Sequence, residues 1–120
     1  MIENHIERGE LYFVHLDPAF GREIGGYKVR PVLVISINDI HRKTRIVTVI
    51  PGTSTPAVYR NVVEVKPDAT NGLKSTTFFQ CHQVRSVDQG RMTAQAFGRI
   101  SANDFRRITD ALKFSLGLID

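Results

Sequence analysis

Arg30-Pro31-Val32-Leu33-Val34-Ile35 is the stretch of the sequence that decides the fold class. The run that starts at Pro31 is almost continuously apolar, which is typical of a strand buried on both faces of a sheet. Proline donates no hydrogen bond to a neighbouring strand, so Pro31 is expected at the strand start or on an edge. The same proline biases Arg30 toward an extended backbone. We therefore predict a buried strand over residues 31–35.

Further β-branched and aromatic runs lie on both sides of this strand, separated by Pro, Asp, Asn and Gly residues. Such runs, when turn residues bound them, predict short strands. They cover residues 11–16, 45–50, 62–65, 76–79 continuing toward 84, and 95–100. Residues 19–28 and 51–56 are predicted to be loops, and residues 38–43 a polar connection. The turn spacing indicates a sheet or small barrel of about half a dozen short strands.

The hydrophobic period changes near the C-terminus. Apolar residues then recur at steps of three and four, which predicts an amphipathic helix with one face packed on the sheet. They are Phe105, Ile108, Leu112 and Leu116. Ser101 followed by Asp104 fits a capping-box-like helix start, and Gly117 fits a C-cap. The predicted fold class is therefore mainly β (α+β), with a C-terminal helix.

Length and charge limit what the chain can be. Its 120 residues fit one domain spanning residues 1–120, because two domains would each be marginal in size. The net charge of +4 favours contacts with a polyanion. Charge alone does not identify a nucleic-acid partner, since many basic proteins bind none.

The cysteine content and the N-terminal sequence bear on location. A single cysteine, Cys81, excludes an intramolecular disulfide and points to a reducing compartment. Residues 1–8 contain no apolar signal-peptide core, and no stretch approaches the roughly 20 apolar residues of a membrane span. We expect a cytoplasmic protein with no membrane partner.

Several kinds of chemistry lack the motifs they require. The four histidines have no two-ligand spacing on one helix, and the sequence has no paired-cysteine knuckle and no Walker-type glycine loop. It also lacks the Gly-x-Ser-x-Gly elbow of acyl-transfer enzymes. We therefore expect no metal and no cofactor.

The remaining polar groups concentrate in residues 21–31, 51–54 and 81–88. Each of these segments lies at the end of a predicted strand. Loops at strand ends can converge on one site, so we expect the functional residues there.

Motifs spread along the chain resemble the MazF/PemK toxin family. They are Arg8-Gly9-Glu10 through Asp17-Pro18, Gly21-x-Glu23, Arg30 through Ser36, His82 through Asp88, and Ala111-Leu112-x-x-Ser115-Leu116-Gly117-Leu118. The resemblance covers nearly the whole chain in the family's order. It implies an SH3-like barrel of the CcdB/PemK type, a homodimer, and cleavage of single-stranded RNA at short sequences. It also implies a cognate antitoxin that inhibits the toxin with an acidic C-terminal tail.

The resemblance also implies roles for individual residues. In the family, the arginine before the strand proline and a threonine at the end of the third strand are central to cleavage, which indicates Arg30 and Thr53. Ser54 is the reserve for Thr53, because the match around Pro51-Gly52 permits a shift of one residue. Glu23 matches a glutamate of the first loop.

The sequence departs from the family at the positions around these residues. Where many members read Gly-Ser-Glu-Gln, this chain reads Gly21-Arg22-Glu23-Ile24. The PemK branch has an acidic residue where this chain has His82 and an arginine where it has Gln80. The acid/base pair proposed for that branch therefore does not transfer to this chain. Contacts to RNA or antitoxin are expected from Arg22, Tyr27, Lys28, Gln83 and Arg85.

A mechanism consistent with these residues needs no metal, because the RNA 2′-hydroxyl can attack the adjacent phosphorus. Arg30 would neutralise the phosphorane oxygens and Thr53 would donate a hydrogen bond to them. Either Glu23 or His82 would move the protons. The product would be a 2′,3′-cyclic phosphate.

Structural roles and other functions compete with these assignments. His82 also fits a hydrogen-bonded structural histidine, Arg85 also fits an anchor for Asp88, and Cys81 fits a small core residue rather than a nucleophile. The alternative functions are a CcdB-like DNA gyrase poison and a noncatalytic RNA-binding barrel. The pair Arg30 and Thr53 favours the nuclease, since a protein that only binds has no need of it.

Overall fold

The predicted buried strand lies in the middle of the sheet. The structure is a computed structural model that describes residues 5–26 and 28–120. In it, β2 (Arg30–Val34) pairs antiparallel with β1 (Glu10–Val14) on one side and β3 (Ile46–Thr53) on the other. Val32 and Val34 are buried on one face of β2, and Leu33 is buried on the other. The prediction of a strand buried on both faces is confirmed.

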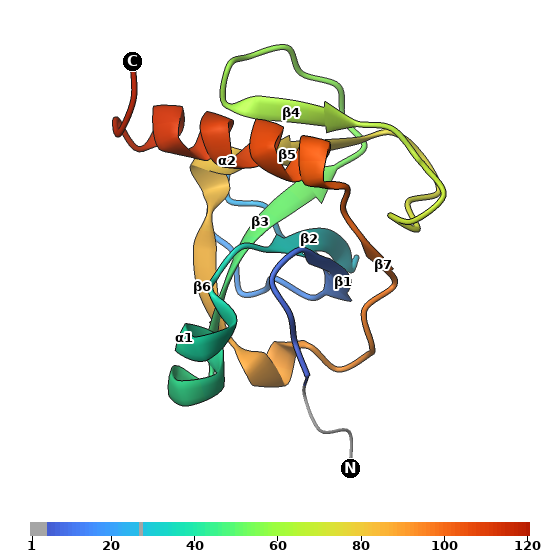
Figure 1. The fold of residues 1–120 in the computed structure, drawn as a ribbon, viewed down its shortest axis with the longest axis vertical. Helices are drawn as coiled ribbons and strands as arrows, with labels where there is room; N and C mark the ends of the chain where they lie inside the picture. Colours follow the sequence, from blue (N-terminus) through green and yellow to red (C-terminus); the bar gives the residue numbers. More distant parts are fainter. Residues whose placement is uncertain (1–4, 27) are drawn as a thin grey trace.

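The other strands extend this sheet in both directions (Figure 1). The order is β4-β5-β3-β2-β1-β7, with β6 also paired to β3, and all pairs are antiparallel. The additional strands are β4 (Val62–Val65), β5 (Thr77–Gln80), β6 (Arg85–Asp88) and β7 (Gly98–Arg99). β3 takes part in two separate strand pairs on the side away from β2. Its first half pairs with β6, and its end pairs with β5.

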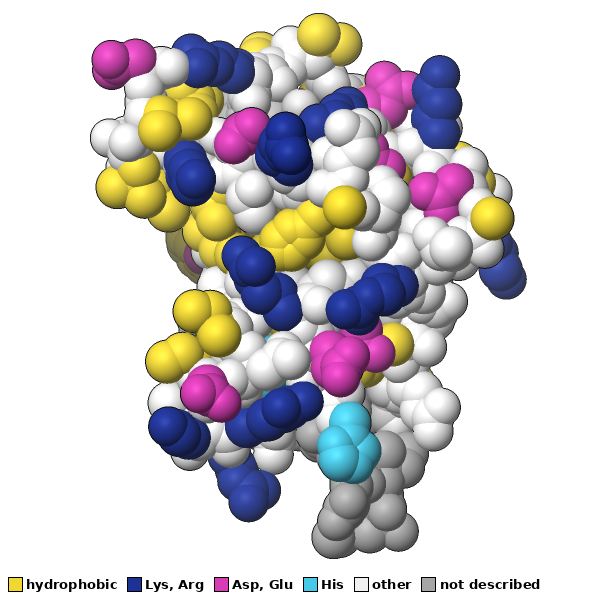
Figure 2. Space-filling model, in the orientation of Figure 1, with side chains coloured by type: hydrophobic (Ala, Val, Ile, Leu, Met, Phe, Trp, Pro, Cys, Tyr) yellow, Lys and Arg dark blue, Asp and Glu magenta, His cyan; other side chains and the backbone are white. Residues whose placement is uncertain are grey.

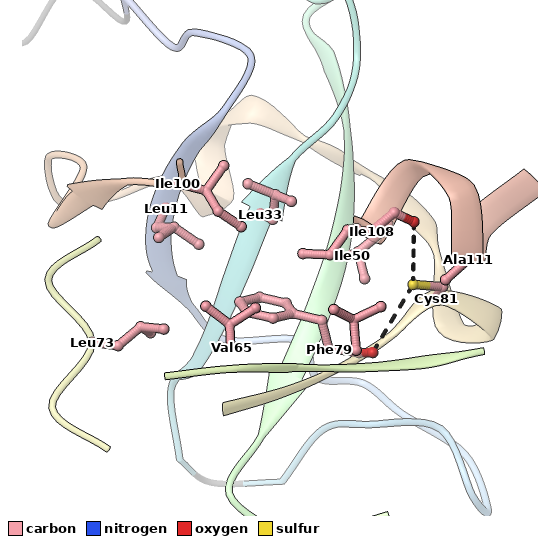
Figure 3. Close-up of a cluster of buried hydrophobic side chains, with 11 residues drawn as sticks. Leu11, Leu33, Ile50, Val65, Leu73, Phe79, Cys81, Ile100, Ile108 and Ala111 are labelled. Atoms are coloured by element: carbon pink, nitrogen blue, oxygen red, sulfur yellow. Dashed lines mark hydrogen bonds between the residues drawn. The ribbon is translucent and has the colours of Figure 1, made fainter. Parts of the chain in front are cut away.

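Two hydrophobic clusters lie on opposite faces of the central strands. Figure 3 shows the first cluster, in which Leu33, Ile50 and Phe79 of the sheet face Ile108 and Ala111 of helix α2 (Ala102–Ser115). The second cluster contains buried residues of β1, β2, β3 and β6, among them Val14, Val32, Val47 and Val87. The result is a mainly antiparallel β half-barrel covered by a C-terminal helix, which confirms the predicted fold class.

Both ends of α2 have the predicted caps. Ser101 Oγ accepts a hydrogen bond from the backbone N–H of Asp104 at 3.1 Å. At the other end Gly117 has φ +74°, and the backbone N–H groups of Gly117 and Leu118 donate to the carbonyls of Phe114 and Lys113. This pair of bonds is the Schellman arrangement.

One member of the predicted helix stripe does not pack in the core. Leu116 follows the last helical residue and its side chain is 55% exposed, so its assignment to the core was wrong. Phe105 and Leu112 are partly buried against the first cluster, and Ile108 is fully buried. The apolar stripe therefore ends one turn earlier than the sequence period indicates.

Residues 38–43 form a helix and not the predicted polar connection. Helix α1 spans Asn38–Thr44, and a second departure is the 3-10 turn η1 (Cys81–Gln83), which ends the strand predicted to continue toward residue 84. A separate strand, β6, then starts at Arg85, and η2 (Gln89–Arg91) follows it. α1 carries no apolar stripe, because its single buried residue is His41, and this explains why hydrophobic periodicity does not reveal it.

The third strand is longer, and the last strand shorter, than predicted. β3 continues through Pro51-Gly52 to Thr53. Gly52 permits this, because a Cβ there would lie 2.5 Å from Cγ2 of Thr77. β7 is confined to Gly98–Arg99, and the backbone N–H of Arg99 donates to the carbonyl of Thr70. Within residues 5–26 and 28–120, neither helix is long and apolar enough to cross a membrane.

Candidate functional site

An open groove of about 700 Å³ lies where the loop after β1 meets the turn η1. Five of the residues predicted from the sequence line it: Arg22, Glu23, His82, Gln83 and Arg85. The other lining residues are Phe20, Ile24, Pro51 and Val84. We call this the cleavage groove, after the role that the sequence resemblance predicts for residues of these segments. All three polar segments named in the sequence analysis, residues 21–31, 51–54 and 81–88, therefore contribute to one groove, the second of them through Pro51.

Gln83 connects the two sides of the cleavage groove. Its Oε1 accepts a hydrogen bond from the backbone N–H of Ile24 at 2.6 Å. Its Nε2 donates to the carbonyl of Arg22 at 3.3 Å and to Oε1 of Gln80 at 3.0 Å. Both ends of the amide are thus used within the protein, so Gln83 holds the loop in place.

Arg85 holds the chain just after β1 and does not anchor Asp88. Its Nη1 donates to the carbonyl of Leu16 at 3.0 Å, whereas Asp88 Oδ1 accepts from the backbone N–H of Gly90 at 2.7 Å. Arg91 reinforces this attachment by donating to the carbonyls of His15 and Asp17. The chain that enters the groove loop is therefore fixed by two arginines, of which sequence analysis identified only Arg85.

Arg30 and Thr53 lie beside the cleavage groove, at the ends of adjacent strands. β2 begins with Arg30 and β3 ends with Thr53. The last pair of the β2–β3 register is Val32 with Pro51, and Arg30 and Thr53 each lie two residues beyond it, where Thr53 pairs with Phe78 of β5. Side chains alternate along a strand and paired residues share a face of the sheet, so Arg30 and Thr53 extend from the face that carries Val32 and Pro51. Pro51, which lines the groove, is on that face as well.

Hydrogen bonds hold both side chains while leaving donor capacity. Arg30 donates from Nε and Nη2 to the carbonyl of Gly25, at 3.1 and 3.0 Å. A guanidinium has five N–H groups, so the remaining ones can reach a ligand. Thr53 Oγ1 accepts from the backbone N–H of Thr55 at 3.2 Å, which leaves its own hydroxyl hydrogen to donate. Ser54 is the first residue beyond β3 and is exposed.

Glu23 caps its own turn. Its Oε1 accepts from the backbone N–H of Phe20 at 3.1 Å, and its backbone N–H donates to the Phe20 carbonyl. Glu23 is exposed at the groove, and its second carboxylate oxygen is in no hydrogen bond found among the described residues. Lys28 is exposed but does not line the groove, and Tyr27 lies outside the described residues.

His82 is exposed at the groove and is oriented by Asn61. The Nδ2 of Asn61 is hydrogen-bonded to Nδ1 of His82. Because the amide nitrogen is the donor, Nδ1 is the acceptor and the ring proton is on Nε2 in the neutral tautomer. Asn61 is itself fixed, since its backbone carbonyl accepts a hydrogen bond from the backbone N–H of Cys81. His82 thus presents an N–H donor that its structural contact does not use.

Besides Arg91, sequence analysis missed three residues of this site. Asn61 orients His82, Gln80 bonds to Gln83, and the Phe20 side chain is 85% exposed on the groove wall. An aromatic residue directly before Gly21 in a polar loop is a signal by which Phe20 could have been found. Nothing local marks Asn61 or Gln80, because their partners lie in other segments. The described part of the chain contains no cluster of three or more His, Cys, Asp or Glu side chains that could hold a metal ion.

Fold and site together define a class of protein: a small antiparallel β half-barrel whose strand-end loops form an open groove with charged and apolar side chains on its walls. A family model described as "PemK-like, MazF-like toxin of type II toxin-antitoxin system" matches residues 7–116. The chain therefore belongs to the PemK-like, MazF-like toxin family.

Curated relatives agree with this assignment over nearly the full length. The chain is 35% identical over 119 residues to "Endoribonuclease EndoA" of Bacillus subtilis (strain 168), covering 96% of this chain and 97% of the relative. It is 34% identical to "Endoribonuclease MazF9" of Mycobacterium tuberculosis, with 94% and 98% covered. Both relatives are named as endoribonucleases.

Solved structures share the fold. A crystal structure of MazF from Deinococcus radiodurans superposes with a TM-score of 0.79 at 25% identity, covering 93% of this chain and 96% of that one. A mycobacterial endoribonuclease in complex with its cognate antitoxin has a TM-score of 0.77 at 21% identity, with 96% and 98% covered. The predicted membership of the MazF/PemK family is confirmed.

Proposed function

We propose that this chain is a metal-independent endoribonuclease that cuts single-stranded RNA as the toxin of a toxin–antitoxin system. The observation that supports the proposal is that β2 begins at Arg30 and β3 ends at Thr53, each two residues beyond the Val32–Pro51 pair, next to the groove that Pro51, Glu23 and His82 line. A cation and a hydroxyl donor can stabilise the charge that develops in phosphodiester cleavage, and a carboxylate and an imidazole can transfer its protons. The names of the relatives favour this function over a CcdB-like gyrase poison.

The RNA supplies its own nucleophile. The 2′-hydroxyl attacks the adjacent phosphorus, the bond to the 5′-oxygen breaks, and a 2′,3′-cyclic phosphate remains. Arg30 neutralises the phosphorane oxygens with the N–H groups that Gly25 does not use. Thr53 donates its hydroxyl hydrogen to the same oxygens, a contact that strengthens as negative charge develops on them. Ser54 remains the reserve for this role.

Proton transfer falls to Glu23 and His82. The free carboxylate oxygen of Glu23 takes the proton of the 2′-hydroxyl as general base. When both ring nitrogens are protonated, His82 delivers the Nε2 proton to the departing 5′-oxygen, and the Asn61 amide then presents its oxygen to the Nδ1–H. Asn61 therefore acts as a positioning residue for the imidazole.

Substrate and inhibitor are proposed to share the cleavage groove. Arg22 lines it and is exposed, and Lys28 and Tyr27 belong to the same loop; all three are proposed to contact the RNA backbone or bases. Gln83 and Arg85 support that loop and the chain just after β1, so their contribution to binding is to keep the groove open. An acidic antitoxin tail would compete for the same cations.

Assembly as a homodimer is also part of the proposal. Apolar side chains remain exposed at and after the end of α2, where Leu116 is 55% and Leu118 is 69% exposed. Exposed apolar side chains that lie close together mark an interaction surface. A two-fold interface would bury this region in both copies.

The first experiment incubates purified protein with a long unstructured RNA and with single-stranded DNA of the same sequence, in EDTA. Cutting of RNA alone, at a short recurring sequence, is expected. Arg30→Ala should slow it by about 10²–10³-fold, the cost of removing one transition-state contact. Arg107→Ala is the matched control, because this arginine pairs with Asp104 on α2 and does not line the groove. Intact RNA with folded wild-type protein would overturn the proposal and leave the gyrase poison and the noncatalytic RNA-binding barrel.

A further inference from the structure

A second groove lies along α2 and shares no lining residue with the cleavage groove. Its volume is about 560 Å³, and its walls include Arg8, Arg99, Ile100, Phe105, Arg106 and Lys113. We call it the basic groove. Figure 2 shows a band of hydrophobic side chains on the face where α2 lies, with Lys and Arg side chains above and below it.

One wall of the basic groove is a single face of α2. Arg106, Thr109 and Lys113 are separated by three and four residues, so their side chains point to the same side of the helix. With a rise of about 1.5 Å per residue, the two cations lie roughly 10 Å apart along the helix axis. The face that carries Ile108 and Ala111 packs on the sheet, so this cationic face is free.

The opposite wall carries two arginines that the backbone holds in place. Arg8 donates from Nε to the carbonyl of Ile35 at 2.9 Å, and its guanidinium carbon lies 4.6 Å from the centre of the Phe105 ring. Arg99 donates from Nη2 to the carbonyl of Arg8 at 3.3 Å. Four cations line the basic groove: Arg8, Arg99, Arg106 and Lys113. Among the described residues they form one ion pair, a long contact of 3.8 Å between Arg99 and Glu7. The groove therefore keeps most of its positive charge for a ligand.

We propose that the basic groove binds the sugar-phosphate backbone of single-stranded RNA outside the segment that is cut. This inference rests on the proposed function, because it extends the path of the same substrate. Two rows of cations facing each other suit a ligand with regularly repeated negative charges. An acidic peptide suits the groove less well, because Arg8 covers the Phe105 ring and leaves no open apolar socket for an anchoring side chain.

The salt dependence of binding gives the proposal a quantitative form. Each phosphate contact to a single strand contributes a slope of about 0.7 to the fall of log K with log salt concentration. The double variant Arg106→Gln/Lys113→Gln removes two such contacts. Its slope for a long RNA should therefore be smaller than that of wild type by about 1.4. Both side chains are exposed and glutamine is a good helix former, so the fold should be retained.

The test measures fluorescence anisotropy of labelled RNA at several salt concentrations. The RNA carries 2′-O-methyl groups, which block the nucleophile and keep it intact. One RNA fills only the cleavage groove and a second one has long flanks. The control variant is Lys66→Gln/Arg107→Gln, which removes the same charge from a surface that does not line the basic groove.

For the flanked RNA we expect a smaller slope in the groove variant and the wild-type slope in the control variant. For the short RNA we expect the same slope in all three proteins. Equal slopes of groove and control variants with the flanked RNA would overturn the inference. So would a groove variant that binds RNA normally but loses affinity for an oligoglutamate peptide, because the occupant would then be acidic protein. Cleavage of unmodified RNA is measured separately, so a failure of the nuclease proposal is distinguished from a failure of this one.

Discussion

The side chain of Gln83 accepts a hydrogen bond from the backbone N–H of Ile24 at 2.6 Å, across 59 residues of sequence. This bond connects the turn after β5 to the loop after β1, and the cleavage groove lies between them. The conformation of the loop that carries Arg22 and Glu23 therefore depends on a residue of a different segment.

Replacement of Gln83 by alanine should loosen this loop. The backbone N–H of Ile24 and the carbonyl of Arg22 would lose their partner, which costs about 1 kcal/mol of unfolding free energy. RNA cleavage should fall by on the order of ten- to a hundredfold, because the groove residues lose their alignment. Hydrogen exchange should speed up at residues 20–26, with exposed Gln95→Ala as the control. Unchanged exchange in this segment would show that Gln83 does not hold the loop.

Replacement of Asn61 by alanine should disturb His82 without unfolding the protein. Asn61 occupies Nδ1 of the imidazole and so keeps the ring proton on Nε2. In the variant, ¹⁵N NMR of the imidazole should show a mixture of both tautomers, and kcat should fall by about tenfold or more. Asn103→Ala, on the exposed side of α2, is the control. A wild-type tautomer and rate in Asn61→Ala would remove Asn61 from the mechanism.

The thiol of Cys81 should be inert in the folded protein. Burial raises its pKa to about 12, because the thiolate would lie in an apolar cluster beneath α2 (Figure 3). At pH 8 the group is therefore protonated, and a thiol reagent such as DTNB should react only after unfolding in guanidinium. Rapid labelling of the native protein would contradict this placement.

Asp68 should make stability sensitive to acid. Its pKa is lowered by hydrogen bonds from the backbone N–H groups of Thr70 and Asn71. A carboxyl group with a lower pKa when folded contributes stability above the unfolded value of about 4, and this contribution is lost as the pH falls through the folded value. Thermal melts from pH 6 downward should therefore show a smaller acid-induced loss for Asp68→Asn than for wild type. Parallel curves for the two proteins would sink the assignment.

The parts of the fold that follow from local patterns could be predicted from the sequence. β2 is buried on both faces and is continuously apolar, and α2 has caps at both ends together with an apolar stripe. Helix α1 was not predicted, because its buried residue is a histidine and not an apolar residue. His41 is satisfied by Ser36 and by the carbonyl of Ile6, and these partners do not appear in any hydrophobic period.

The sequence predicted which residues line the candidate site better than it predicted the hydrogen bonds that position them. Strand-end positions led to Arg22, Glu23 and His82, which do line one groove. The supporting contacts of Asn61 and Arg91 join segments that are far apart in the chain, and their geometry depends on the turns that bring those segments together. The sequence pattern does not show which of these distant segments come into contact.

The shared strand β3 has a consequence for how the toxin is removed. Its first half pairs with β6 and its end pairs with β5, so both strand pairs and both hydrophobic clusters depend on one continuous segment. Neither half can open fully while the other keeps its neighbours, and the molecule should therefore melt as one cooperative unit. A protease that captures the opened chain would then destroy the whole domain, and no folded fragment that still carries both Arg30 and Thr53 should persist.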